Sequence, residues 1–338
     1  YVRAHDFRRY LHKNLEDFII ETPLENPLDF LNKQFDASLI KDVQTKWIPY
    51  DFKNQNIDDF LENLDIDKTV EISSIQGGYS NAIKQLNKFI EVGYQDYAKY
   101  RSDPSKEASS QLSPYFHSGQ ISTHEVFDKI SELESWSPES INPKMVGRRE
   151  GWWGSTENFE SFMDELITWR ELGYHTCVRR ANYNQYSSLP EWAIKTLHEH
   201  SSDEREHIYS LDELTYSQTH DEIWNAAQNQ LRTQGVIQNY LRMLWGKKIL
   251  EWTPNPQIAL SYMITLNDRY SLDGRDPNSY SGVFWILGRY DRAWGPERSI
   301  FGKIRYMTSD STARKFNLKP YLEKWGNESL GVSTSILK

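Results

Sequence analysis

Amide side chains, alternating charges, one glycine and one proline crowd the segment LNDRYSLDGRDPNSY, residues 266–280. Side chains such as Asn267 and Asp273 offer hydrogen-bond donors and acceptors. A segment this polar is costly to bury unless a ligand or another part of the protein pairs with it. The residues alone leave two interpretations open, a binding loop for a polar ligand and a solvated surface turn.

A second polar segment, SSQLSPYFHSGQIS (residues 109–122), places small hydroxyl side chains in front of a run that is compatible with a helix. Backbone amides at a helix start, with serine hydroxyls beside them, can bind an anion such as a phosphate. The same pattern also serves as an ordinary helix cap. The segment is therefore a candidate anion site and no more.

Trp245 and Trp252 are seven residues apart in the helix-like run LRMLWGKKILEW. Two helical turns separate them, so both indoles lie on nearly the same face, with Cα atoms roughly 10 Å apart along the axis. From the residues alone, packing in a hydrophobic core is the favoured interpretation.

Other kinds of chemistry find little support. His198, His200 and His207 lie close in sequence, but no further ligand follows at the spacing of a metal site, so no metal is expected. No Gly-x-Ser-x-Gly elbow is present, and no motif surrounds Cys177. Since Cys177 is the only cysteine, an internal disulfide is excluded and a reducing intracellular compartment, cytoplasmic or nuclear, is expected.

The composition suits a large globular protein that stacks aromatic rings on a flat partner. The 338 residues allow one large helical domain or two unequal domains, and 12 of them are Trp although the mean hydropathy is only -0.73. A net charge of -9 argues against bulk attraction to nucleic acid, yet Lys and Arg outnumber Asp and Glu over residues 242–324. No apolar run is long enough to span a membrane.

The elements that must position these residues are mostly helices. Apolar spacings of three and four predict helices near residues 7–19, 79–100, 155–172, 190–200, 221–231, 235–252 and 258–270. Residues 69–78 are compatible with one short strand, and residues 135–154 form a loop. The region after Tyr79 is therefore predicted to be a nearly all-α domain.

Several motifs in the same order resemble one known family. DGRDP, FGKIRYM and RMLWGKKILEW resemble the C-terminal flavin-binding domain of photolyases and cryptochromes, most closely class II cyclobutane pyrimidine dimer photolyases. GGYSNAIKQLNKFI, SDEREHIYSLDEL and THDEIWNAAQ resemble its entry and central helices. The resemblance implies a mainly α fold, with a helical FAD-binding domain at residues 76–338. Residues 1–75 would be the linker after an N-terminal α/β antenna domain that is largely absent.

The resemblance implies FAD, reduced and anionic in its active form, as the cofactor, and an antenna chromophore in the missing domain. Asn267 would face the flavin N5, and Arg242 would pair with Asp273 against the isoalloxazine, where a guanidinium stabilises the anion. The diphosphate and ribityl chain would be held by Tyr97, Ser109, Ser110, Leu112 and Ser113.

The family also implies a role for the tryptophans. An electron would pass from the surface to photoexcited flavin through Trp252, then Trp224, then Trp245 nearest the flavin. The repeat of two helical turns suits hops of roughly 10 Å. With the resemblance, electron relay becomes the favoured interpretation over core packing.

A flipped-out dimer would pack against two aromatic walls, Trp169 and Trp285, and photolyases are among the enzymes that flip bases. Glu165 would hydrogen-bond the pyrimidine edge from one turn before Trp169, and Met243 would add an apolar contact. UV-damaged DNA is the expected partner of a monomer. Its phosphates would meet Arg292, Arg298, Lys303, Arg305, Arg314 and Lys315.

The expected function is therefore light-driven splitting of pyrimidine dimers, with a cryptochrome-like photoreceptor and a flavin-free helical partner domain as alternatives. Some features depart from the family. Gln238 stands where many photolyases have histidine, and residues at Asn239 and Met243 argue against (6-4) repair. The stretch between Trp285 and Asp291 is about one residue shorter than expected, and the loop GRREGWWG has no counterpart.

Overall fold

The computed structural model describes residues 1, 3–20, 23–24, 26, 28, 37–47, 51 and 56–327. Their contacts divide the chain into two compact units. The larger unit joins residues 1–20 to residues 72–338, and the smaller unit contains residues 21–71. Residues 1–20, expected to be part of a linker, thus belong with the helical unit; the division at residues 75 and 76 remains a proposal about the domains of a longer protein.

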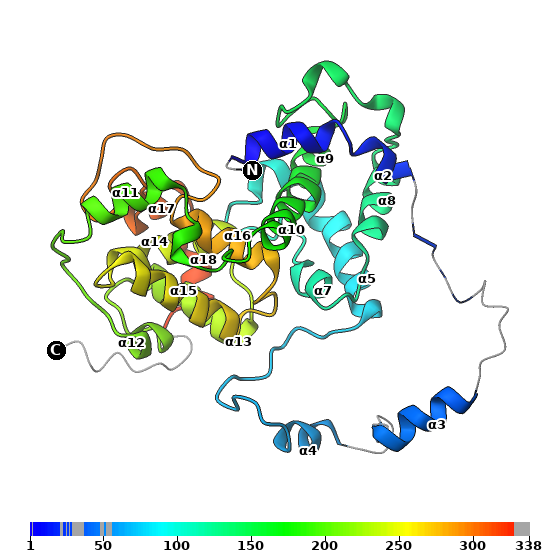
Figure 1. Ribbon diagram of the computed structural model, residues 1–338, viewed down its shortest axis with the longest axis horizontal. Coiled ribbons are helices and arrows are strands. Elements are labelled where there is room, and N and C mark those ends of the chain that lie inside the picture. The colour runs from blue at the N-terminus through cyan, green and yellow to red at the C-terminus, as the bar shows by residue number, and fades with distance from the viewer. Residues whose placement is uncertain are drawn as a thin grey trace. The chain divides into compact units, whose positions relative to one another are not determined.

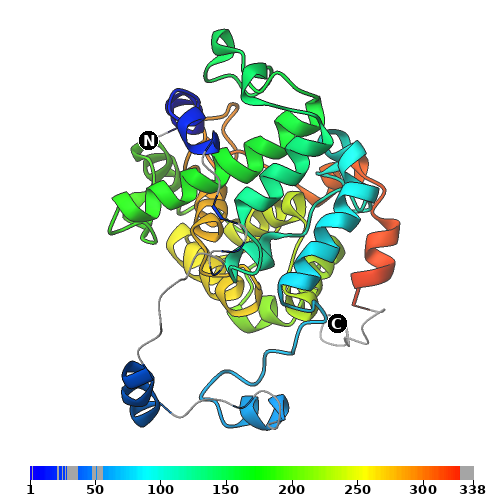
Figure 2. The ribbon, with the colours of Figure 1, turned by 90° about the vertical axis from the view of Figure 1, so that its right-hand side faces the viewer.

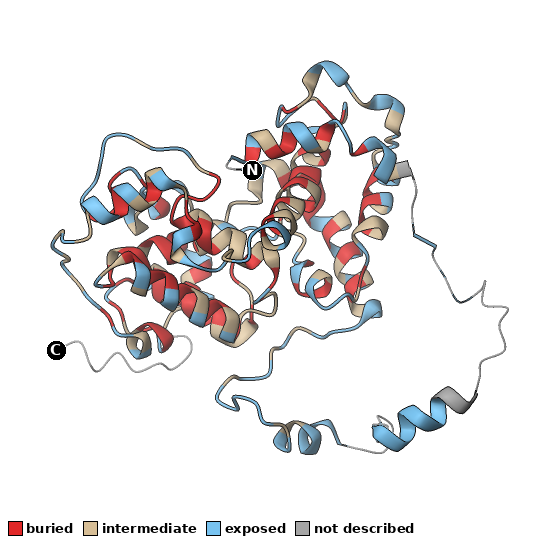
Figure 3. Ribbon diagram, in the orientation of Figure 1, coloured by how far each residue is buried: buried red, intermediate tan, exposed pale blue. Residues whose placement is uncertain are grey.

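The smaller unit has two described helices, α3 (Ala37–Lys46) and α4 (Ile57–Glu62). The Asn56 side chain caps α4 by accepting a hydrogen bond from the Asp58 amide. None of the α4 side chains is buried, and both helices are largely exposed in Figure 3.

The larger unit is built from helices (Figures 1 and 2), in agreement with the prediction of a mainly α fold. In its described part there is no strand beyond two isolated bridges, so the short strand expected within residues 69–78 is absent. There the Ser73 hydroxyl donates a hydrogen bond to the Gln234 carbonyl.

The helices are α1 (Ala4–His12), α2 (Glu16–Ile20), α5 (Tyr79–Lys88), α6 (Tyr97–Tyr100), α7 (Ser113–His117), α8 (Thr123–Leu133), α9 (Glu157–Met163), α10 (Arg170–Arg179), α11 (Glu191–Glu199), α12 (Leu211–Thr215), α13 (Glu222–Gln234), α14 (Asn239–Glu251), α15 (Pro256–Tyr270), α16 (Pro277–Ile286), α17 (Ser309–Lys315) and α18 (Lys319–Trp325).

Two predicted helices contain π-helical segments. Residues 89–93 (η2) follow α5, and residues 164–169 (η6) join α9 to α10. A π-helical turn adds a residue to the turn and re-aims the side chains, which often occurs at functional sites. The second segment carries Glu165 and Trp169, so their directions differ from those on a regular α-helix.

Helix α1 packs against η6 through a buried ion pair. Arg8 Nε lies 2.8 Å from Asp164 Oδ1, and Arg8 Nη2 lies 2.9 Å from Asp164 Oδ2. This bidentate geometry is the strong form of the Arg–carboxylate interaction. The contact ties the first helix of the chain to the segment that carries Glu165.

The loop GRREGWWG is folded around a buried carboxylate. Glu160 accepts hydrogen bonds from the amides of Gly151 (2.8 Å) and Gly154 (3.0 Å). Trp152, which is 1% exposed, stacks on His12 of α1 with 3.9 Å between ring centroids. The loop is therefore part of the core between α1 and α9.

Helices α13, α14, α15 and α16 pack against one another, and their buried residues line the facing sides (Figure 3). Gly235, with φ of 75°, ends α13 and so does not begin the next helix, as residues 235–252 had been expected to do. A Cβ on Gly246 would lie 2.1 Å from Ile286 Cδ1, so α14 and α16 meet closely at that glycine.

Candidate functional site

An ion pair joins α14 to the segment that follows α15. Arg242 Nη2 lies 3.4 Å from Asp273 Oδ1, and both side chains are largely buried. Burial opposes ionisation of Asp273, but Arg242 and the hydroxyls of Ser271 and Ser113 outweigh it and hold the pKa of the carboxyl below its ordinary value. These contacts favour the ionised form of Asp273, and the pair brings the expected partners Arg242 and Asp273 together.

Asn267 is buried on α15, one turn from the end of that helix. Its amide nitrogen donates to the Ser279 hydroxyl of α16 and lies 3.3 Å from Asp268 Oδ1. Asp268 also accepts from the Arg275 amide (3.0 Å) and the Tyr280 hydroxyl (3.1 Å). The polar segment 266–280 is therefore an internally paired, half-buried connection and not a solvated turn.

The segment before α7 approaches the same ion pair. Ser113 begins α7 and its hydroxyl contributes to the low pKa of Asp273. Leu112 is fully buried, Tyr97 is 6% exposed on α6, and the Ser110 carbonyl accepts from Gln85 Nε2 (2.9 Å). Ser109 lies beside Ser110 at intermediate exposure. The hydroxyls of Ser113 and Ser271 and the Arg242 guanidinium thus occur around Asp273, and donors of this kind fit a flavin dinucleotide.

Glu165 forms an ion pair that sequence reasoning missed. Arg101 Nη1 lies 2.5 Å from Glu165 Oε1, and the Arg101 guanidinium lies 5.8 Å from the Tyr97 ring centroid. Burial raises the pKa of the Glu165 carboxyl and neighbouring Asp164 adds to the shift, whereas Arg101 opposes it. Gln238 caps α14 and donates to the Arg101 carbonyl (2.9 Å), so the residue that departs from the family pattern also touches this site.

Arg101 could not be recognised from its surroundings in the sequence, because RSDP gives only the signal of a helix end. Its partner lies 64 positions away on another helix. The only available hint was that a half-buried carboxylate needs a cation or donors nearby.

Trp169 and Trp285 lie directly against each other. Their ring centroids are 4.5 Å apart and the planes differ by 18°. Trp169 projects from η6 and Trp285 from α16, and both remain partly exposed. Because the rings are stacked, there is no room for another flat group between them, and a ligand meets their outer faces or edges. Met243 lies on α14 at intermediate exposure.

The three tryptophans of the expected relay form a connected series. Trp224 Nε1 donates to the Trp245 carbonyl (3.0 Å), and Trp224 and Trp252 have ring centroids 5.7 Å apart. Trp245 Nε1 donates to Gln228 Oε1 (2.8 Å). The Trp224–Trp252 separation lies well within the roughly 10 Å that two helical turns span.

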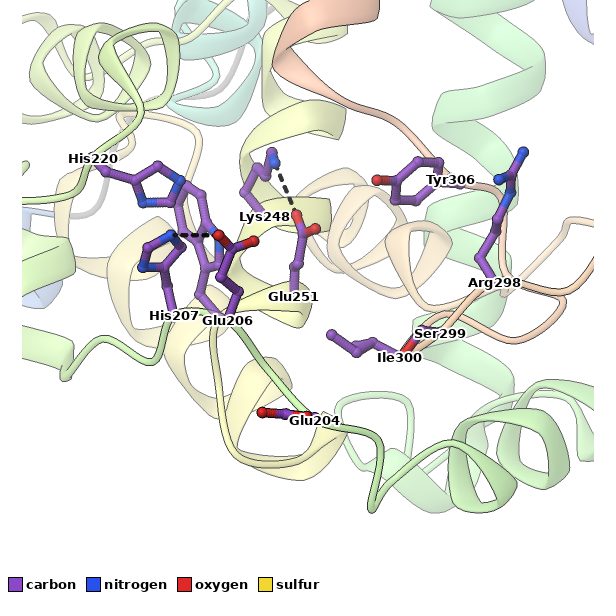
Figure 4. A pocket seen from close by; sticks show the side chains of 11 residues that line it. Glu204, Glu206, His207, His220, Lys248, Glu251, Arg298, Ser299, Ile300 and Tyr306 are labelled. Atoms are coloured by element: carbon purple, nitrogen blue, oxygen red, sulfur yellow. Dashed lines mark ion pairs between the residues drawn. The ribbon is translucent and has the colours of Figure 1, made fainter.

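Trp252 was expected at the surface, but it is buried, with only 2% of its surface exposed. Tyr209 and His220 cover it, with ring centroids 5.4 and 5.2 Å away. His220 and Trp252 also line a cavity of about 400 Å³, shown in Figure 4. Its charged walls include the Lys248–Glu251 ion pair (2.8 Å), and Lys248 Nζ lies 5.3 Å from the Trp252 ring centroid. This cavity adjoins the outer end of the tryptophan series.

The six basic residues expected to contact DNA are all exposed and fall into two groups. In the first group, Arg292 and Arg305 lie 4.5 and 5.1 Å from the Trp294 ring centroid. Lys303 pairs with Glu297 (3.0 Å) and Arg298 lies 5.8 Å from the Tyr306 ring. The second group, on α17, contains Arg314 and Lys315, and Lys315 Nζ lies 4.4 Å from the Tyr240 ring.

Two further absences concern the described residues alone. No group of three or more His, Cys, Asp or Glu side chains within them could hold a metal ion. None of the helices described is long and apolar enough to cross a membrane.

The chain is similar in sequence to three curated proteins named deoxyribodipyrimidine photo-lyase, although no protein-family model matches it. It is 40% identical over 267 residues to that of Methanothermobacter thermautotrophicus, covering 79% of this chain and 55% of the relative. It is 38% identical over 263 residues to that of Potorous tridactylus, covering 77% and 46%. It is 35% identical over 329 residues to that of Arabidopsis thaliana, covering 94% of this chain and 59% of the relative. The chain thus spans about half the length of these relatives.

Solved structures share its fold. A bacterial class III photolyase from Agrobacterium tumefaciens matches with a TM-score of 0.55 and 17% identity, over 80% of this chain and 50% of the other. A cryptochrome from Synechocystis matches with a TM-score of 0.53 and 14% identity, over 77% of this chain and 47% of the other. By sequence and by fold, the chain belongs to the photolyase and cryptochrome family.

Proposed function

We propose that the protein containing this chain repairs DNA in the light, splitting cyclobutane pyrimidine dimers by electron transfer from reduced FAD. The observation that carries the proposal is the juxtaposition on η6 and α16 of a stacked tryptophan pair and a carboxylate held by Arg101. A flat apolar surface beside a group able to hydrogen-bond a pyrimidine edge suits a flipped-out pyrimidine dimer.

Bound FAD supplies the photoexcited electron that opens the cyclobutane ring and regains it afterwards. The chain's residues orient and stabilise it. Arg242, paired with Asp273, would stabilise a reduced and anionic flavin, and the Asn267 amide would serve either protonation state of its N5. Tyr97, Leu112 and the hydroxyls of Ser109, Ser110 and Ser113 hold the phosphate and ribityl part.

The tryptophans provide the route by which an external electron reaches the cofactor. Indole is among the few side chains that form a usable cation radical. The order Trp252, Trp224, Trp245 follows the contacts, and burial of all three shields the radicals from water.

The residues that recognise the lesion are Glu165, Trp169, Trp285 and Met243. The two basic groups described above contact the DNA phosphates. Trp169 and Trp285 present their outer faces to the dimer. Glu165, kept close by Arg101, accepts from or donates to the pyrimidine edge according to its protonation state.

The finer points of the proposal follow the resemblance. The chain is of the class II type, the whole protein acts as a monomer on UV-damaged DNA inside the cell, and an antenna pigment occupies the domain that precedes this chain. Similarity to the three photo-lyases at 35% to 40% identity supports the activity, which belongs to the longer protein.

The test is an absorbance measurement on the purified protein. The protein is reduced, mixed with DNA that carries thymine dimers, and illuminated, and the return of thymine absorbance in the ultraviolet is followed. Recovery that requires both light and bound flavin supports repair. Absence of recovery from protein that retains FAD and photoreduces normally refutes it.

A cryptochrome-like photoreceptor is the second candidate. Its support is the intact tryptophan series together with a 50-residue match, 50% identical, to Cryptochrome-2 of Arabidopsis thaliana. It predicts photoreduction without preference for damaged DNA. Selective binding of dimer-containing DNA in a competition assay argues against it.

A further inference from the structure

A buried lysine beside the relay has no part in the roles described so far. Lys247 lies on α14, directly after Gly246, and is only 3% exposed. Among the described residues its ammonium has no ion pair; its hydrogen bond goes to the backbone carbonyl of Ile286. Asp291 and Arg305 act on it with opposite signs from a longer distance.

Burying a lysine without a carboxylate partner costs folding free energy. A cation removed from water without a carboxylate partner loses much of its solvation, and one carbonyl does not replace it. Burial accordingly lowers the pKa of Lys247 to about 7. A methionine of similar length would fill the same space at a lower cost in folding free energy.

The carbonyl that accepts the hydrogen bond of Lys247 lies at the end of α16, next to Trp285. Ile286 is the last residue of α16, where the carbonyls lack partners within the helix and carry the negative end of its dipole. The preceding residue is Trp285, whose ring stacks on Trp169. At the same contact Gly246 brings α14 against Ile286 so closely that no Cβ would fit.

We propose that Lys247 is a positioning residue for the lesion surface, since its bond to the Ile286 carbonyl fixes the end of α16 and thereby the plane of Trp285. Past this point the chain turns sharply through Gly288, whose φ is 103°, and hydrogen bonds from Leu287 and Arg289 return to the Phe284 carbonyl. Lys247 binds the start of this turn from α14, and Arg289 binds Tyr183 and Ser188 at its other end. The inference rests on the proposed function only in taking Trp285 to contact the dimer.

The test compares Lys247→Met with the matched control Lys84→Met, which changes an exposed lysine on α5. In Lys247→Met we expect dimer-containing DNA to bind about tenfold more weakly, because the hydrogen bond from Lys247 to the end of α16 is lost. FAD content and the repair rate at saturating DNA should be unchanged in this variant. Its melting temperature should be equal to that of the wild type or higher. Lys84→Met should match the wild type in every measurement.

Hydrogen exchange gives a readout that needs no DNA. The amides of residues 287–289 should exchange faster in Lys247→Met while peptides from α13 and α15 stay unchanged. Lys247→Arg, which keeps a charged donor, should restore part of the protection and part of the affinity. In a Trp285→Ala background, Lys247→Met should weaken dimer binding no further.

Two results overturn the inference. The first is wild-type exchange and wild-type dimer affinity in Lys247→Met; the second is loss of FAD with faster exchange throughout, which would give Lys247 a role in the whole fold. If the wild type itself does not distinguish damaged DNA, the proposed function fails, whereas local exchange at residues 287–289 still decides whether Lys247 holds the end of α16.

Discussion

The charge pair of Glu165 and Arg101 shows how one residue sets the chemistry of another. Burial and Asp164 raise the pKa of the Glu165 carboxyl, and Arg101 is the main group that opposes them. The pKa of Glu165 therefore depends on a side chain that no local sequence pattern revealed.

Replacing Arg101 by Met should raise the pKa of Glu165 further, because a cation within hydrogen-bond distance favours the carboxylate. We expect the pH at which dimer affinity changes to move upward by the same amount. The measurement is a titration of dimer affinity against pH for the wild type, Arg101→Met and Glu165→Gln. The last variant should show no such pH dependence, and equal profiles for all three would contradict the assignment.

A second prediction at this scale concerns the relay. Trp245→Phe should stop photoreduction of oxidised FAD, because phenylalanine is far harder to oxidise than indole, and should spare repair by chemically reduced protein. Transient absorption under blue light measures the first effect and the repair assay measures the second. The variant Trp136→Phe, in another part of the core, serves as the control. Loss of FAD from Trp245→Phe would show that the ring is needed for packing.

Helices were the most predictable elements. Apolar spacing located α5, α9, α11, α13, α14 and α15, because each buries one face. The π-helical turns were not predictable, since the extra residue leaves no mark in the apolar period. Long-range partners such as Arg8 with Asp164 were equally hidden, because nothing near either residue in the sequence identifies the other.

The docking of α1 carries a pH dependence that can be measured. Burial lowers the pKa of His12 to about 4 from 6.5, with Arg8 adding to the shift, and the ring is stacked on Trp152. Between these values the unfolded chain binds more protons than the folded one. Stability therefore falls as the pH falls from about 6.5 through about 4.

The loss due to His12 should approach about 3 kcal/mol at the acidic end, from the size of the pKa shift. Denaturant unfolding of the wild type and His12→Phe at a series of pH values measures this loss, because the free energy of unfolding of the wild type should fall relative to that of the variant as the pH is lowered. His5→Phe, on the exposed side of the same helix, is the control. A constant difference between wild type and His12→Phe would mean that His12 is charged or accessible in the folded state.

At the scale of the whole molecule, the charge distribution matters more than the total. The net charge is -9, yet exposed cations gather around Trp294 and on α17. The uneven charge was visible in the sequence, but the separation of these cations into two groups and the stacking of Arg292 and Arg305 on one ring depend on the fold. The net charge alone would have argued against a nucleic-acid partner.

If these cations contact phosphates, binding of DNA should release counterions and weaken steeply as salt rises. Each contact contributes about 0.9 to the slope of log affinity against log salt concentration. Arg292→Ala and Lys315→Ala, one from each group, should each lower the magnitude of the slope by about one and weaken binding of damaged and intact DNA alike, because phosphate contacts carry no base information.

Lys84→Ala, on α5, is the control and should leave the slope unchanged. Fluorescence anisotropy with a labelled duplex at several salt concentrations gives the slopes. Because Arg292 and Lys315 belong to different groups, the two single changes and their combination also locate the duplex. Additive losses place both groups on DNA at once, a loss from one variant alone assigns binding to that group, and unchanged slopes in both would remove these residues from the interface.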